Sequence, residues 1–221
     1  MKNPDDTVVT PSARILVYYY DLPYDEFMDY VMWPWQIVSF GRRHFNYQNP
    51  ADWIIVDPDS LEVSIVPEKP ELQAAYDRGE VFVLSYYEHG GCVWSLRGEG
   101  PQCRWDTAQI AGLAILDTGQ TAGLTIPESC SELSTEDRTA ACRYALASYT
   151  AWCNGEAYEY DIQVESPNGN TVETGNVVFG ISSLIDYIRN DLAQLRITNY
   201  VVEDNAIINN TDIGPINISE E

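Results

Sequence analysis

Four side chains that can bind a metal ion or take part in catalysis follow one another closely: His89, Cys92, Cys103 and Asp106. Imidazole, thiolate and carboxylate groups are all zinc ligands, and a thiol beside an imidazole can act as a nucleophile with its base. Their spacing matches no common zinc motif, and the chain is expected to reverse at Gly90-Gly91, between His89 and Cys92. We therefore expect no metal and no cofactor, and these residues do not specify a reaction.

A second interpretation of the same stretch is structural. Asp106 can accept a hydrogen bond from the imidazole N–H of His89, which would hold the end of a hairpin against the following loop. Trp105 precedes this carboxylate, so the candidate cluster is His89, Trp105 and Asp106. An acid–base role for the cluster would require a pocket around it.

Arg42-Arg43-His44 is the densest basic cluster in the sequence. The planar guanidinium group of arginine matches phosphate oxygens with two parallel hydrogen bonds, so this loop could hold a phosphate. In a chain with many more acidic than basic residues, the same arginines could instead pair with carboxylates of the protein itself.

Acidity is the strongest signal in the composition. The 221 residues include 34 Asp and Glu against 12 Lys and Arg, which gives a formal net charge of −22. Such a surface repels phosphate groups, so direct binding of nucleic acid through a broad basic face is excluded. Because 45% of the residues are hydrophobic, the chain can still bury a core.

The acidic excess is largest in residues 151–221, where apolar and polar side chains alternate over residues 158–165. This alternation predicts a strand with aromatic residues on the core and acids outside. Carboxylates at alternate positions lie about 6.6 to 7 Å apart, close to twice the roughly 3.4 Å rise per phosphate of a DNA strand. A three-residue loop with a bulge would then place Glu173 opposite Glu165. The partner-binding face expected here consists of Glu159, Asp161, Glu165, Glu173 and Asp186.

The elements that must position these residues are short strands and two principal helices. Runs rich in β-branched and aromatic residues predict strands over 14–20, 53–56, 61–66, 81–87, 92–96, 113–116, 158–165, 171–179 and 197–208, with a loop-rich stretch at 97–111. Hairpins together with segregated helices predict an α+β fold with an antiparallel or mixed sheet. We expect one domain over residues 1–221, in which 1–12 and 209–221 are loosely ordered.

Helical spacing predicts a short helix over 70–78 and longer helices over 134–154 and about 181–195. In the first long helix, Ser134 is the expected N-cap and Gly155 the stop. Its expected buried stripe is Ala141, Tyr144, Ala145, Ser148 and Trp152. The expected stripe of the second is Ile181, Leu184, Ile185, Ile188, Leu192 and Leu195.

The cysteines and the apolar runs indicate a cellular location. Five cysteines without a Cys-x-x-Cys pair are typical of free thiols, most of them buried. No apolar run approaches the roughly 18 residues of a membrane helix, and the first residues lack the apolar stretch of a signal peptide. We expect a soluble cytoplasmic protein that does not contact a membrane.

Two motifs carry a resemblance to a known group. Tyr86-Tyr87-Glu88-His89-Gly90-Gly91, followed by Trp105-Asp106-Thr107-Ala108-Gln109-Ile110-Ala111-Gly112, resembles a pattern of uncharacterised phage and mobile-element proteins. The run Tyr149-Thr150-Ala151-Trp152-Cys153-Asn154-Gly155-Glu156-Ala157-Tyr158-Glu159-Tyr160 is similar to their second motif. The resemblance implies a viral or mobile-element origin, and hence the cytoplasm of a host cell, but no activity.

These observations favour an acidic accessory protein of phage type that inhibits a host DNA-binding or defence complex by imitating the charge of duplex DNA. Its partner would be a host protein and not nucleic acid, and no oligomeric state follows. Two alternatives stay open. One is a small enzyme or nucleotide-binding protein that uses His89, Asp106 and the Arg42-Arg43 loop. The other is a salt-adapted interaction domain without inhibitory activity.

Overall fold

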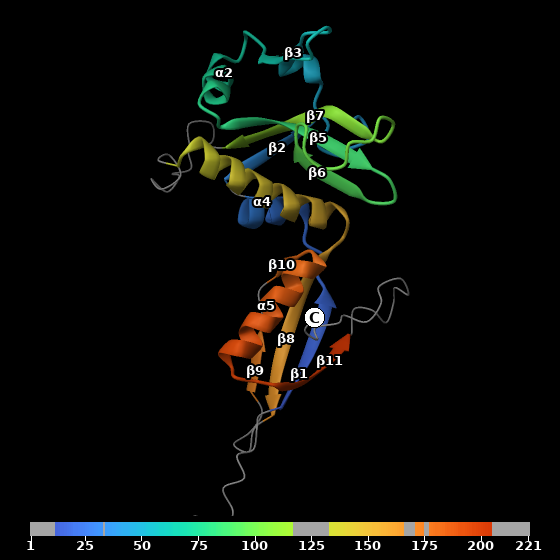
Figure 1. Ribbon diagram of the computed structural model, residues 1–221, viewed down its shortest axis with the longest axis vertical. Coiled ribbons are helices and arrows are strands. Elements are labelled where there is room, and N and C mark those ends of the chain that lie inside the picture. The colour runs from blue at the N-terminus through green and yellow to red at the C-terminus, as the bar shows by residue number, and fades with distance from the viewer. Residues whose placement is uncertain (1–11, 33, 117–132, 166–170, 175–176, 205–221) are drawn as a thin grey trace, which may run out of the picture. The chain divides into compact units, whose positions relative to one another are not determined.

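The computed structural model describes residues 12–32, 34–116, 133–165, 171–174 and 177–204. The chain groups into two compact units: unit 1 combines Met1–Leu22 with Gly155–Glu221, and unit 2 is Pro23–Asn154 (Figure 1). Unit 1 thus brings together two segments, 12–22 and 155–204, that are far apart in the sequence. Local patterns cannot reveal this grouping, because it depends on strands that pair across more than a hundred residues.

Unit 1 is a five-stranded sheet with one helix on it. Its elements are β1 (Ser12–Tyr19), β8 (Ala157–Glu165), β9 (Thr171–Thr174), β10 (Val178–Phe179), α5 (Ile181–Gln194) and β11 (Asn199–Asp204). Strand β8 pairs with β1 on one side and with β9 and β10 on the other, all antiparallel, while β11 runs parallel to β1. The predicted α+β class with a mixed sheet is confirmed.

The core of unit 1 follows the predicted alternation. Tyr158, Tyr160 and Ile162 of β8 are buried together with Leu184 and Ile188 of α5. The hydroxyl of Tyr160 donates a 2.5 Å hydrogen bond to Asp191 of the same helix, and burial raises the pKa of that hydroxyl. Because successive strand residues point to opposite faces, Glu159 and Asp161 lie on the face of the sheet away from α5.

The predicted register between β8 and β9 is wrong. Glu173 pairs with Ile162, and Val172 pairs with Gln163, so Glu173 does not stand opposite Glu165. The pairing differs by three residues from the prediction, which rested on the turn at Asn168-Gly169. Because an odd shift in register exchanges the residues that share a face, the pairing that was predicted to align Glu173 with Glu165 is not formed.

Unit 2 is built around a second sheet, with strand order β2-β7-β5-β6 and all pairs antiparallel. Its strands are β2 (Trp35–Ser39), β5 (Val81–Glu88), β6 (Cys92–Leu96) and β7 (Thr107–Leu116). Strand β5 lies between β7 and β6. Strand β7 begins inside the stretch 97–111 that was expected to be loop, because its polar first half alternates too weakly to signal a strand.

Both faces of this sheet are covered (Figure 1). One face packs against the hairpin of β3 (Ile54–Val56) and β4 (Val63–Ile65) and against α2 (Pro70–Asp77). The other packs against α4 (Thr135–Cys153), near α1 (Tyr24–Phe27) and the π-helical turn η1 (Met28–Met32); a 3₁₀ turn, η2 (Pro50–Asp52), precedes β3. The strands predicted over 53–56 and 61–66 and the short helix predicted over 70–78 are confirmed.

Helix α4 begins as predicted but presents a different face. Ser134 accepts a hydrogen bond from the Asp137 N–H at 3.1 Å, which confirms the N-cap. The buried residues are Cys142, Ala145, Leu146, Tyr149 and Ala151, so the stripe is displaced by about one position from the prediction, and Tyr144 is 71% exposed. Small alanines at many positions make the apolar face ambiguous. None of the helices in the described residues is long and apolar enough to span a membrane.

Gly112 permits the close approach of β2 and β7. It pairs with Ser39, and a Cβ atom at this position would collide with the backbone carbonyl of Val38. Any side chain here would therefore push β2 away from the sheet. The sequence Ala111-Gly112-Leu113 is buried, so the strand has little room to shift.

Candidate functional site

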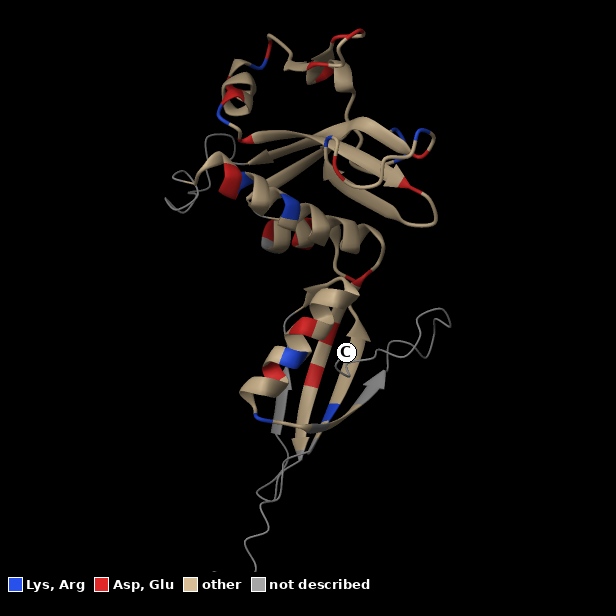
Figure 2. Cartoon of the chain, viewed as in Figure 1, with Lys and Arg blue, Asp and Glu red and all other residues tan. Residues whose placement is uncertain are grey.

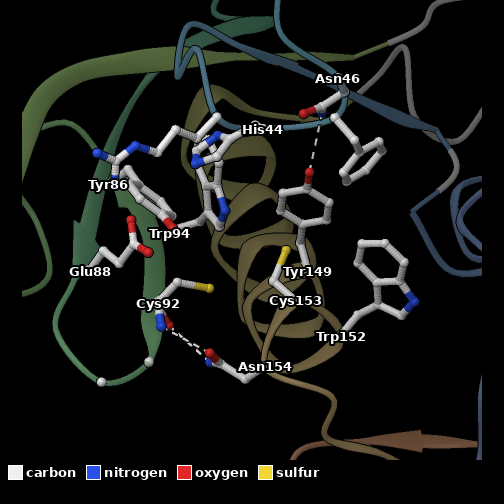
Figure 3. Close-up of a pocket in the computed structure, with 14 residues that line it drawn as sticks. His44, Asn46, Tyr86, Glu88, Cys92, Trp94, Tyr149, Trp152, Cys153 and Asn154 are labelled. Atoms are coloured by element: carbon white, nitrogen blue, oxygen red, sulfur yellow. Dashed lines mark hydrogen bonds between the residues drawn. The ribbon is translucent and has the colours of Figure 1, made fainter.

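An open cleft of about 640 Å³ lies in unit 2 between the β5–β6 hairpin, the last turns of α4 and the loop that follows β2 (Figure 3). It is lined mainly by aromatic, sulfur-containing and amide side chains. The lining residues are Arg43, His44, Phe45, Asn46, Tyr86, Glu88, Gly90, Gly91, Cys92, Trp94, Tyr149, Trp152, Cys153 and Asn154.

Strand pairing explains why four of these side chains share one wall. Tyr86 pairs with Trp94 and Glu88 pairs with Cys92, and directly paired residues of antiparallel strands project to the same face. Alternate residues of each strand also share a face. The hairpin therefore presents all four side chains toward α4, where Trp94 contacts the ring of Tyr149 at 5.6 Å.

His44 is held in a fixed orientation at the cleft. A 2.6 Å hydrogen bond joins its Nδ1 to the buried Ser39 Oγ, and its ring meets those of Tyr86 and Trp94 edge to face at 4.6 and 5.4 Å. Gly41 makes room for this arrangement, since a Cβ there would lie 2.7 Å from the imidazole. Burial lowers the pKa of His44 below its usual 6.5, so the ring is neutral at pH 7.

The opposite wall carries exposed aromatic surface. Trp152 stacks on Phe27 with ring centroids 5.0 Å apart, which fixes its plane. Phe45 meets Trp152 edge to face at 6.1 Å and leaves 66% of its own surface exposed. A planar ligand would find a fixed indole and an accessible phenyl ring on this side.

Asn46 leaves a polar atom without a partner. Its Nδ2 donates to the hydroxyl of Tyr149 at 3.3 Å and to the carbonyl of Ile37 at 3.4 Å. Its Oδ1 is buried and has no hydrogen-bond partner among the described residues. A buried acceptor without a partner costs about 1 to 3 kcal/mol, so a donor supplied by a ligand would be favourable at this position.

Thr150 of α4 and Asn154, the residue that caps its C-terminal end, hold the outer edge of β6. Asn154 accepts a hydrogen bond from the Cys92 N–H at 2.8 Å and donates to the Cys92 carbonyl at 2.9 Å. One helical turn earlier, Thr150 accepts from the Trp94 N–H at 2.9 Å. These contacts set the width of the cleft, because they fix the end of α4 against the strand that forms the opposite wall.

Arg43 brings a cation to the cleft. Both Arg42 and Arg43 are exposed, and neither forms an ion pair with any residue in the described ranges. The described residues therefore supply no carboxylate partner for these arginines, and the alternative of an internal partner stays a prediction. Arg42 lines only a neighbouring hollow, whereas Arg43 lines both.

The predicted cluster lies outside the cleft. His89 Nδ1 is 3.5 Å from Asp106 Oδ2, and the Cys103 thiol donates to the same oxygen at 3.2 Å. Trp105 is 83% exposed and has Arg104 over its ring. Within the residues that the structure describes, no group of three or more metal-binding side chains comes together.

The five predicted acidic residues do not form one described face. Glu159 and Asp161 are half-buried on the sheet face away from α5, whereas Asp186 is exposed on α5 itself. Figure 2 shows acidic residues on both β8 and α5, with basic residues on β1 and α5. The side chains of Glu165 and Glu173 lie outside the described part of the structure.

The cysteines depart from the burial expected of them. Cys92, Cys103, Cys142 and Cys153 are free thiols, but Cys142 alone of these four is buried. Cys130 lies outside the described residues. Cys92 and Cys153 line the cleft, whereas the sequence grouped Cys92 with His89, Cys103 and Asp106.

Comparison of the chain with family models, with curated proteins and with solved structures finds no match. The resemblance to phage and mobile-element proteins therefore stays a prediction.

Proposed function

We propose that this protein binds a small molecule that carries a planar heteroaromatic ring and an anionic group, as a nucleoside monophosphate does. The observation that carries the proposal is the cleft of unit 2, which combines exposed aromatic surface with two polar groups. These are Asn46 Oδ1, which has no hydrogen-bond partner among the described residues, and the guanidinium of Arg43, which forms no ion pair with them. Clefts of a few hundred Å³ with aromatic walls and few polar groups are the usual form of small-molecule sites.

The ring of the ligand would lie against Phe45 and Trp152. Stacking of a base on an aromatic side chain contributes about 1 to 3 kcal/mol and tolerates any base. A ring N–H within reach of Asn46 Oδ1 would satisfy the buried acceptor. Neutral His44 offers a further polar edge among the rings.

Arg43 would bind the anionic group, since its guanidinium matches phosphate or carboxylate oxygens. Glu88 also lines the cleft, so the positive charge there is limited. This balance favours a single phosphate over a triphosphate, because added negative charges would be repelled by Glu88 and by the acidic surface as a whole. The proposal thus retains Arg43 of the predicted loop but replaces His89 and Asp106 with cleft residues.

The test is calorimetric titration of the full chain with AMP, GMP, CMP and UMP, with their nucleosides and with inorganic phosphate. We expect a nucleoside monophosphate to bind. Phe45→Ala should weaken both nucleoside and nucleotide about 5- to 100-fold. Arg43→Gln should weaken the nucleotide about 10- to 100-fold and the nucleoside little.

Matched controls lie close by. Arg42→Gln makes the same charge change in the same loop, and Trp105→Ala removes an exposed ring that lies outside the cleft. Each should bind as the parent does. Absence of binding to all probes at millimolar concentration, in both 0.15 M and 2 M KCl, would contradict the proposal.

A second candidate is the acidic decoy that the charge of the chain first suggested. One observation favours it: in the described part of unit 1 the sheet face that carries Glu159 and Asp161 has no covering layer of its own, since α5 lies on the other side. A row of fixed carboxylates there could pair with Arg and Lys of a host DNA-binding protein.

Capture of host proteins at low and high salt tests the decoy. Replacing Glu159, Asp161 and Glu165 with Gln, Asn and Gln should reduce both the capture of a specific partner and its salt dependence. Asp186→Asn, on α5, is the control and should change neither. Equal capture by the triple variant would remove this face from consideration.

A further inference from the structure

Two thiols face each other across the floor of the cleft. Cys92 is the first residue of β6, and Cys153 is the last residue of α4. Both side chains line the same cleft. Figure 3 shows both sulfur atoms in the space between the strand and the helix. Sixty residues of sequence separate the two, so the fold brings them together.

The backbone around the pair is held by neighbouring contacts. The side chain of Asn154, the residue after Cys153, forms two hydrogen bonds with the backbone of Cys92. Thr150 binds the backbone of Trp94 in the same way one turn back along α4. A disulfide requires a narrow range of Cα separations and side-chain directions, and these contacts hold the two cysteines in constant proximity.

We propose that Cys92 and Cys153 form a reversible disulfide that ties β6 to the end of α4. One thiol, as its thiolate, attacks hydrogen peroxide, giving a sulfenic acid and releasing water. The second thiol then displaces the hydroxyl group as a second water, with formation of the S–S bond. The two thiols lose two electrons and two protons in total, and the peroxide gains them. A dithiol reductant reverses the step.

The thiol of Cys153 resists ionisation. The hydrogen bond to Cys92, together with burial, raises the pKa of the Cys153 thiol. Although Cys153 as a residue is exposed, its sulfur lies among Cys92, Tyr149 and Trp94. Because the thiolate is the reactive form, we expect the disulfide to form faster at pH 8.5 than at pH 7.

The experiment uses the full chain, first reduced and then treated with hydrogen peroxide, alkylated and mapped by mass spectrometry. We expect one linked peptide pair, containing Cys92 and Cys153, and a fall from five free thiols to three. Cys103→Ser should still form this pair, whereas Cys92→Ser and Cys153→Ser should not. Linkage through Cys130 or another cysteine, or no linkage at all, would overturn the proposal.

Thermal unfolding supplies a second readout that does not depend on ligand binding. The crosslink closes a long loop and so restricts the unfolded chain. Oxidation should therefore raise the melting temperature of the parent and of Cys103→Ser, and dithiothreitol should reverse the rise. The Cys92→Ser variant should show no rise. A lower melting temperature after oxidation would mean that the bond strains the fold, and the assignment of a pre-arranged pair would then be wrong.

Discussion

The two units use a sheet in different ways. In unit 1 a single helix covers one face, and alternate residues of β8 divide cleanly between core and outer face. In unit 2 both faces are covered, and the cleft lies where α4 meets the end of the β5–β6 hairpin. Unit 1 is held mainly by apolar packing, which the alternation of β8 and the apolar stripe of α5 predict from the sequence. The cleft of unit 2 depends on contacts between side chains and backbone that are far apart in sequence.

The largest effect that we predict falls on the core of unit 1. Leu184 is fully buried between α5 and the sheet, so Leu184→Ala should reduce the free energy of unfolding by about 2 to 5 kcal/mol. Urea unfolding followed by far-UV circular dichroism measures this loss. Ser182→Ala, at an exposed position of the same helix, should have little effect. Equal stability of the two variants would show that apolar packing does not dominate unit 1.

In unit 2 the comparable weak point is a backbone contact. Gly112→Ala should cost about 2 to 3 kcal/mol, because the added methyl group collides with the Val38 carbonyl. All six tryptophans lie in unit 2, so their fluorescence during urea unfolding reports on this unit. Gly91→Ala, where a Cβ makes only ordinary contacts, is the matched control. A tolerated alanine at 112 would mean that β2 can move away from β7.

The dependence of unit 2 on contacts between side chain and backbone can be tested at Asn154. Asn154→Ala removes both hydrogen bonds to the Cys92 backbone and should cost about 1 to 2 kcal/mol of stability, as measured by tryptophan fluorescence in urea. It should also widen the cleft and weaken any ligand bound there. Asn190→Ala, at an exposed position of α5 in unit 1, should leave stability near that of the parent. If both substitutions reduce the free energy of unfolding equally, the hydrogen bonds between Asn154 and Cys92 are not what holds α4 to β6.

The smallest predicted effect is a pH dependence at His44. The folded-state pKa of His44 lies below its unfolded value of about 6.5 because the ring is buried. As the pH falls through 6.5, the unfolded chain therefore binds more protons at this site than the folded protein does. Titration of His44 thus lowers the stability of the folded protein as the pH decreases. Glu88 partly opposes the shift. Compared with the parent, His44→Gln should show a smaller loss of melting temperature between pH 7.5 and 5.5.

Much of the fold could be predicted because the relevant signals are local. The alternation of β8, the apolar stripe of α5 and the cap at Ser134 each depend on residues a few positions apart, and the structure has all three. The stripe of α4 was displaced because alanine and cysteine give it little contrast. The register of β9 was wrong because turn residues alone fix neither loop length nor bulge.

The site was only partly predictable. Tyr86, Glu88, Cys92 and Trp94 occur as two pairs of alternate residues around the Gly90-Gly91 turn, so the predicted hairpin could have placed them on one face. The contribution of α4 to the cleft could not be predicted, because the types and spacing of Tyr149, Trp152 and Cys153 indicate only the end of a helix. His89 and Asp106 lie close together, but neither lines the cleft.

The hydrogen bonds that Thr150 and Asn154 form with β6 also cover the edge of a sheet. Strand β6 is the last strand of its sheet, and the exposed edge of a sheet is a template on which strands of other chains can add. Here the outward N–H and carbonyl groups of Cys92 and Trp94 are already bound by Asn154 and Thr150. The helix thus occupies the place of a missing neighbour strand, and it blocks this edge against the pairing between molecules that leads to aggregation.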